Sequence, residues 1–274
     1  MSTNYELRTT NYELKHKGFS LTEVLMAVGI FSVAMIFIAG AFPVAIHFTT
    51  IASEQTIAAV VADEAFAKIR LYGVNPSDAN MQIGHLAPFV NQVPFYNVRV
   101  TDINSDEFAY PSDSAVDKQY YWSAICRRIR IDSNEVQVTV FVSRKIGTGT
   151  EYYVRDYSNW PVLMTINYPQ AVLLEVQAGG ASDEIVINDL DNFNDPPYEN
   201  TFVNDGYTIV EDSTGQVYRV LQRYVDTVGI DRVQLDKDWN AAYLPPTYVW
   251  VISPPVNGGR YPCVGVFQKV IRFE

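Results

Sequence analysis

One acidic residue, Glu23, stands at the start of an apolar run, where its charge needs an explanation. The chain reads KHKGFSLTEVLMAVGIF from Lys15 to Phe31, and after Glu23 no Asp, Glu, Lys or Arg follows until Glu54. An unpaired carboxylate is costly in apolar surroundings, and a cation or hydrogen-bond donors reduce that cost. Glu23 is therefore a candidate for pairing with a cationic group.

The two cysteines, Cys126 and Cys263, are far apart in the sequence and do not form the CxxC spacing of a metal or redox pair. Two interpretations stay open. Either both cysteines are buried thiols, or one disulfide between them joins two parts of an exported domain. The second interpretation predicts a covalent clasp between the two β modules described below.

Two acidic loops carry oxygen-rich side chains of the kind that calcium binds. In DINSDEFAYPSD, Asp102, Asn104 and Asp106 match the first ligand positions of an EF-hand loop, but a glutamate occupies the glycine position. In DLDNFNDPPYEN, which begins with Asp189 and Asp191, a phenylalanine stands where a ligand belongs. We therefore expect solvated loops and no cofactor, with calcium binding as the lesser alternative.

Residues for other chemistry are scattered. The histidines, His16, His47 and His85, do not cluster, and the sequence contains no P-loop, GxSxG or Rossmann signature. The net charge of −11 opposes binding to nucleic-acid phosphates, which depends on basic contacts. We expect neither an enzyme nor a nucleic-acid-binding protein.

The apolar run from Val24 to Ile46 is long enough to cross a bilayer, which takes about 20 residues. Basic residues at 15–17 precede it, so the positive-inside rule places the N-terminus in the cytoplasm and the chain after about His47 outside. Pro43 is expected to interrupt and kink this helix. A second helical stretch is expected to end at about Tyr72, because Gly73 and Pro76 are stop signals.

The pattern after Pro76 predicts strands. EVQVTVFVSRK at 135–145 places four valines on one face and polar residues on the other, as in a half-buried strand, and 120–131 precedes it in a hairpin. A further strand is expected at 171–178, and several more after 181 suggest a small barrel or sandwich. The basic triplet Arg127, Arg128 and Arg130 is interpreted as a solvated edge.

These elements predict an α+β fold. A long N-terminal transmembrane and amphipathic helix packs on an antiparallel β domain, and a second small β-rich module follows. The expected divisions are a leader at 1–18, the helix at 19–75 with its span at 24–46, a β domain at 76–180 and the second module at 181–274.

The segment Gly18-Phe19-Ser20-Leu21-Thr22-Glu23, between a basic leader and a long apolar helix, resembles the N-terminus of type IV pilin-like proteins. These are the pilins, minor pilins and secretion-system pseudopilins. The resemblance implies that a prepilin peptidase cuts between Gly18 and Phe19 and methylates the new amine of Phe19. It also implies that Glu23, now the fifth residue, pairs with the amine of a neighbouring subunit.

The function implied by this resemblance is a structural subunit, a minor pilin or pseudopilin, of a type IV pilus or type II secretion pseudopilus. Its implied partners are the peptidase, other subunits contacted through the N-terminal helix, and inner-membrane assembly machinery, with the globular part in the periplasm. Physical chemistry agrees, because Glu23 lies four residues after Phe19 on the same helix face and in the first turn, where the helix dipole favours negative charge. The alternatives are a membrane-anchored binding protein or adhesin that shares only the leader, and an anchored hydrolase.

Overall fold

A single helix dominates the N-terminal part of the computed structural model. The structure describes residues 18–78, 81, 92–113, 115, 117–130, 133–147, 149–155, 163–188, 199–240 and 247–274. Helix α1 runs from Leu21 to Tyr72 with Pro43 inside it, so the expected interruption is wrong. A proline removes its own N–H···O bond, and the residues on either side keep helical geometry. The predicted end at Tyr72 is confirmed, and Gly73 follows with a φ of 73°.

The chain divides into two compact units, Met1–Ala52 and Ser53–Glu274. The second unit, which we call the head, contains the last five turns of α1 and the strands. Its first layer is an antiparallel sheet in the order β1 (Val93–Pro94), β3 (Tyr120–Arg128), β4 (Glu135–Arg144) and β13 (Cys263–Arg272). Strand β2 (Ala109–Tyr110) also pairs with β3, next to the short helices α2 (Phe95–Val98) and η2 (Ser105–Phe108). The predicted β3–β4 hairpin is confirmed.

The second part of the head is a closed barrel. Its strand order is β10 (Val217–Val225), β11 (Asp231–Leu235), β8 (Glu184–Asn188), β7 (Ala171–Ala178), β12 (Thr247–Ile252) and β9 (Thr208–Glu211). The short helix η4 (Glu199–Phe202) lies between β8 and β9, and a separate ribbon of β5 (Tyr152–Arg155) and β6 (Leu163–Ile166) precedes β7. Side chains such as Leu174, Ile185 and Tyr218 fill the barrel, so its interior is a packed core.

Along the chain, the barrel is inserted between β4 and β13, two strands that pair with each other in the sheet. Strand β4 ends at Arg144 and β13 starts at Cys263, and the amide of Arg144 donates to the carbonyl of Pro262 at 2.9 Å. The expected division at residue 180 therefore assigns two strands wrongly. Strand β7 belongs to the barrel, and β13 returns to the first sheet, where nine residue pairs join it to β4. Alternation predicts a strand but not its partner, because pairing depends on residues distant in sequence.

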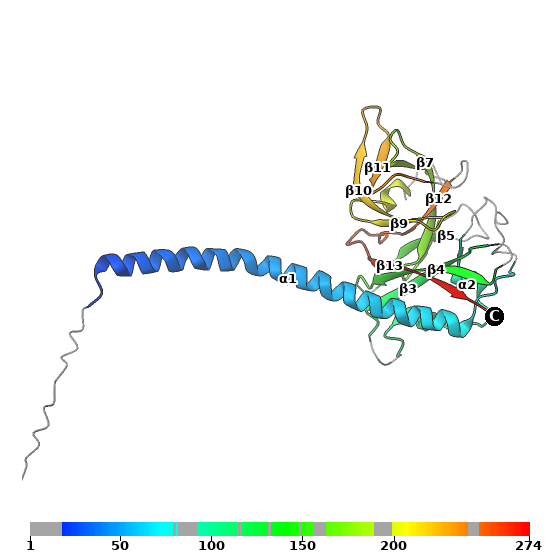
Figure 1. Cartoon of the computed structure of the whole chain (residues 1–274), viewed down its shortest axis with the longest axis horizontal. Coiled ribbons are helices and arrows are strands. Elements are labelled where there is room, and N and C mark those ends of the chain that lie inside the picture. The colour runs from blue at the N-terminus through cyan, green and yellow to red at the C-terminus, as the bar shows by residue number, and fades with distance from the viewer. Residues whose placement is uncertain are drawn as a thin grey trace, which may run out of the picture. The chain divides into compact units, whose positions relative to one another are not determined.

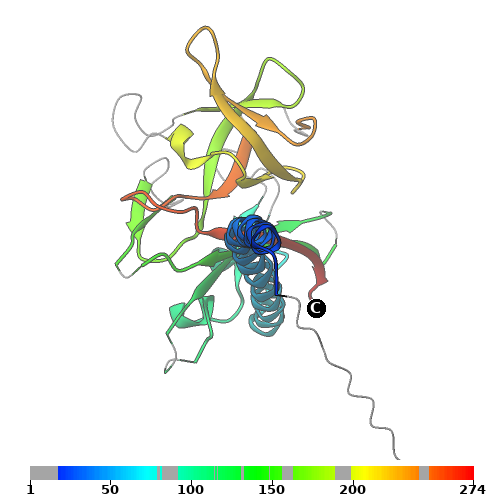
Figure 2. The same ribbon diagram turned by 90° about the vertical axis from the view of Figure 1, so that its left-hand side faces the viewer.

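The sheet is covered on both faces, so the head has three layers, helix, sheet and barrel (Figure 1 and Figure 2). On one face Ala62, Ala65 and Ile69 of α1 pack against the valines of β4. On the other, Phe141 of β4 packs with Leu173 and Trp250 of the barrel. The prediction that the strand at 135–145 has one buried and one solvent-exposed face is therefore wrong, because Thr139 and Ser143 on the expected solvent face are also buried.

Candidate processing and assembly site

The residues around the expected cleavage position lie just before α1. Gly18 and Phe19 are exposed and non-helical, and the Phe19 side chain is 86% exposed. Ser20 is the residue before the helix, and Glu23 is in the first turn. The bond between Gly18 and Phe19 therefore lies in exposed, irregular backbone, and the acid lies within the first turn of the helix.

Ser20 and Glu23 form a reciprocal capping box. The Glu23 amide donates to Ser20 Oγ at 3.2 Å, and the Ser20 amide donates to Glu23 Oε2 at 2.9 Å. The Ser20 hydroxyl also donates to Oε2 at 3.0 Å. This arrangement satisfies amide groups that have no partner within the helix. The sequence interpretation missed the role of Ser20, although its S-x-x-E spacing is the usual signature of such a box.

Residues 21–50 of α1 are exposed along their whole length. Within the described residues α1 is the one helix long and apolar enough to cross a membrane. Its hydroxyls have internal partners, since Ser32, Thr49 and Thr50 each donate to the carbonyl four residues earlier. This surface suits lipid or other apolar helices, and the helix has the length and composition of a single-pass anchor.

Ion pairs hold the second half of α1 on the sheet. Glu54 lies 2.5 Å from Arg144 of β4 and 3.3 Å from Arg260. Near the other end, Lys68 pairs with Glu64, as the i, i+4 spacing predicts, and with Glu107 at 2.9 Å. Burial lowers the pKa of the Arg144 guanidinium, and the Glu54 carboxylate opposes this shift. The pair of Glu54 and Arg144 therefore links α1 directly to β4, in addition to the apolar core.

A buried polar cluster joins the barrel to the sheet. Asp212, after β9, accepts from the Gln92 amide at 3.0 Å and from Trp250 Nε1 at 2.9 Å. The Gln92 side chain donates in turn to the carbonyls of Glu211 and Asp212. Since all of these residues are buried, the barrel is fixed to the sheet by hydrogen bonds that water does not replace.

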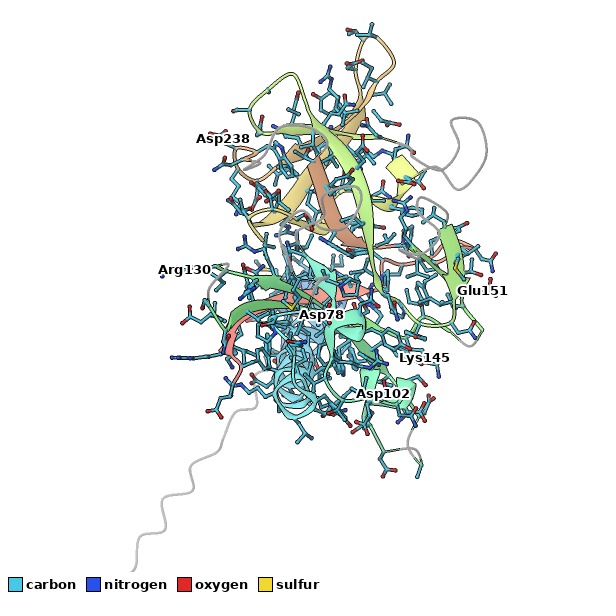
Figure 3. All side chains as sticks on the ribbon, turned by 90° about the vertical axis from the view of Figure 1, so that its right-hand side faces the viewer. Asp78, Asp102, Arg130, Lys145, Glu151 and Asp238 are labelled. Atoms are coloured by element: carbon cyan, nitrogen blue, oxygen red, sulfur yellow. The ribbon has the colours of Figure 1, made fainter. Side chains whose placement is uncertain are left out.

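Arg127 takes part in the same junction. Its guanidinium donates to the Ser213 carbonyl of the barrel at 2.5 Å and to Gln137 of β4. The interpretation of the basic triplet as a solvated edge is therefore wrong for Arg127. It holds for Arg130, which is exposed beyond the end of β3 (Figure 3).

Of the two interpretations of the cysteines, the structure agrees with two thiols and not with a disulfide, since both are free, Cys126 buried and Cys263 half-buried. Cys126 lies opposite Val138, and Cys263 opposite Ser143, on the two sides of β4. Two inter-strand spacings of about 4.8 Å already exceed the roughly 7 Å limit for bridged Cα atoms, and the offset along β4 adds more. Burial raises the pKa of both thiols, which stay protonated and inert at neutral pH.

Two calcium candidates in the first loop, Asp102 and Asn104, have other partners. Asp102, at the surface of the loop (Figure 3), pairs with Arg99 at 2.8 Å, and the Asn104 side chain accepts from the Asp106 amide to cap η2. Asp189 and Asp191 lie outside the described residues. Among the described residues no group of three or more His, Cys, Asp or Glu side chains is placed to hold a metal ion.

A shallow concavity of about 600 Å³ lies at one end of the barrel, where β10 ends and β11 begins. It is lined by Asn204, Asp205, Arg223, Tyr224, Val225 and Asp231. Arg223 pairs with Asp231 at 3.1 Å and its amide donates to Asp205 at 2.6 Å. Arg223 is thus bonded to both aspartates of this surface.

Comparison with known proteins identifies the N-terminal segment. The family model of the prokaryotic N-terminal methylation motif matches residues 14–39, which is the leader signature of type IV pilins and confirms the expected resemblance. Comparison with curated proteins and with solved structures returns no significant match. The motif covers the end of the basic segment, the expected cleavage position, Glu23 and the start of the apolar helix, and does not extend to the head.

Proposed function

We propose that this protein is a structural subunit, a minor pilin or pseudopilin, of a type IV pilus or type II secretion pseudopilus. The observation that carries the proposal is the methylation motif at 14–39, with Glu23 as the one acid at the start of an exposed apolar helix. The role is mechanical. The subunit is held in the inner membrane, processed, and then moved into a filament by machinery that other proteins provide.

The geometry around the leader fits such processing. A membrane prepilin peptidase cuts between Gly18 and Phe19, in the exposed segment before α1, and methylates the new amine of Phe19. Removal of the leader places a cation next to the helix start. An amine and a carboxylate that enter an apolar filament core neutralise each other, so the pairing of Glu23 with the amine of a neighbouring subunit sets the register of the assembly.

The head supports a subunit of low copy number. A barrel inserted in the chain between β4 and β13 enlarges the head, and its attachment through Asp212 and Gln92 presents a fixed surface to partner subunits or cargo. In the membrane the N-terminus faces the cytoplasm and the head lies in the periplasm. In the filament, α1 forms the contacts with other subunits.

Processing is tested by the mass of the chain from membranes that contain the peptidase. The expected mass is that of residues 19–274 with one added methyl group. Gly18→Leu should leave the leader in place. A full-length wild-type chain, or a cut elsewhere, would contradict the processing step.

Assembly is tested by comparing Glu23→Ala with wild type. The variant should be inserted and cleaved, but recovered poorly with its partner subunits. Glu23→Gln is the matched control for charge, because glutamine retains the hydrogen bonds of a capping box and lacks the anion. Equal recovery of Glu23→Ala and wild type with the partner subunits would contradict the proposal.

The second candidate is a membrane-anchored binding protein or adhesin that shares only the leader. It is favoured by the concavity at the barrel end, around Arg223 and Asp231. Such a protein would be processed but found outside any filament, and substitutions of Arg223 would affect ligand capture without affecting assembly.

A further inference from the structure

The capping box engages one oxygen of the Glu23 carboxylate. Both contacts from Ser20, from its amide at 2.9 Å and its hydroxyl at 3.0 Å, go to Oε2. In the described part of the chain no hydrogen bond to Oε1 is found, and the side chain is exposed. The carboxylate is therefore held in one orientation with its other oxygen available.

The Ser20 hydroxyl has enough donor and acceptor sites to cap the helix and to orient the Glu23 carboxylate at the same time. It accepts from the Glu23 amide, lies 2.9 Å from Thr22 Oγ1, and donates its one proton to Glu23 Oε2. A serine hydroxyl has one donor and two acceptor sites, so all three are used when Thr22 acts as the donor in its contact. Alanine and glycine have no side-chain donor and cannot fix the carboxylate in this way.

We propose that Ser20 is a positioning residue for assembly, which holds Glu23 so that Oε1 accepts the cationic amine of the neighbouring subunit. This inference rests on the proposed function, in which that amine is the partner of Glu23. Cleavage between Gly18 and Phe19 leaves the box in place, because Ser20 becomes the second residue and keeps its amide and its side chain.

The physical advantage is pre-organisation. A glutamate side chain loses considerable rotamer freedom when it is fixed, and the box imposes this loss before the subunits meet. The two donors also reduce the cost of holding an anion in apolar surroundings until the amine arrives. Because they leave Oε1 available, the ion pair forms without breaking the box.

The test uses the full-length chain in cells that contain the peptidase and the partner subunits. The measured quantity is the ratio of cleaved chain recovered with partner subunits to cleaved chain left alone in the membrane. Counting only cleaved chain removes differences in insertion or processing. Ser20→Ala should lower this ratio about fivefold or more, as the loss of a serine cap contact suggests.

Two further variants separate positioning from simple stabilisation of the helix end. Glycine is nearly as good as serine at this position for helix stability. A simple capping role therefore predicts that Ser20→Gly assembles like wild type, whereas positioning predicts that it fails like Ser20→Ala. Ser20→Thr keeps the hydroxyl and should restore assembly. Thr22→Val, which removes a contact to Ser20 but none to Glu23, is the matched control and should assemble like wild type.

The outcomes are distinct. Loss in Ser20→Ala and Ser20→Gly with recovery in Ser20→Thr supports the inference. Wild-type assembly of Ser20→Ala or Ser20→Gly, or failure of Ser20→Thr, overturns it while the proposed function stands, provided that Glu23→Ala is still defective. If Glu23→Ala also assembles like wild type, the proposed function itself fails.

Discussion

Phe141 offers a direct test of the three-layered head. Its side chain is 0% exposed and packs with Leu173 and Trp250 from the inserted barrel. Replacement by alanine removes a buried ring and leaves a cavity between two layers, which typically costs about 3–5 kcal/mol. For a head of this size, each kcal/mol lowers the melting temperature by about 2–4 °C, so Phe141→Ala should lower it by about 6–20 °C.

The assay is thermal unfolding of the detergent-solubilised full chain, followed by tryptophan fluorescence and circular dichroism. Leu221→Ala on β10 is the matched control, because that side chain is 53% exposed and its loss should cost less than about 0.5 kcal/mol. Hydrogen exchange should also increase in β7 and β12, which contact the sheet. A shift below about 2 °C for Phe141→Ala would refute the packing of the barrel on the sheet.

Three further predictions concern buried charges and thiols. Glu54→Ala removes the carboxylate that lies between Arg144 and Arg260, and should destabilise the head by about 1–3 kcal/mol in a denaturant titration, since a partly buried cation loses its partner. Cys126 and Cys263 should both react with a maleimide after unfolding without reductant, and Cys126 should be protected in the native chain; a mass showing a bridge would contradict this. Burial raises the pKa of both thiols above their unfolded value, so the folded state retains its protons. The contribution of the thiols to the free energy of unfolding should then be constant below about pH 8.5 and fall above it, by up to about 1.4 kcal/mol per pH unit for each thiol. Cys126→Ala should reduce this slope.

The polar junction between barrel and sheet could not be predicted from the sequence. Gln92 and Asp212 are far apart along the chain, and each is an ordinary loop residue until the fold brings them together. The same holds for Glu54 and Arg144. In contrast, the capping box of Ser20 and Glu23 depends on residues three positions apart, so the sequence alone is enough to predict it.

Local patterns were sufficient for the long apolar helix, the methylation motif and most strands of this protein. The long apolar helix, the methylation motif at 14–39 and the strand 171–178 each depend on neighbouring residues, and these features are confirmed. Their physical basis is hydrophobicity and periodicity over short distances.

Tertiary structure decided which strands pair and what covers them. An alternating strand exposes two faces, and its residue types indicate the apolar one but not whether a distant segment will cover the other. The return of β13 to β4, the separation of Cys126 from Cys263 and the burial of Phe141 under a barrel all follow from that long-range pairing. The N-terminal segment therefore carries the pilin-type methylation motif, and the fold alone determines the surface of the head.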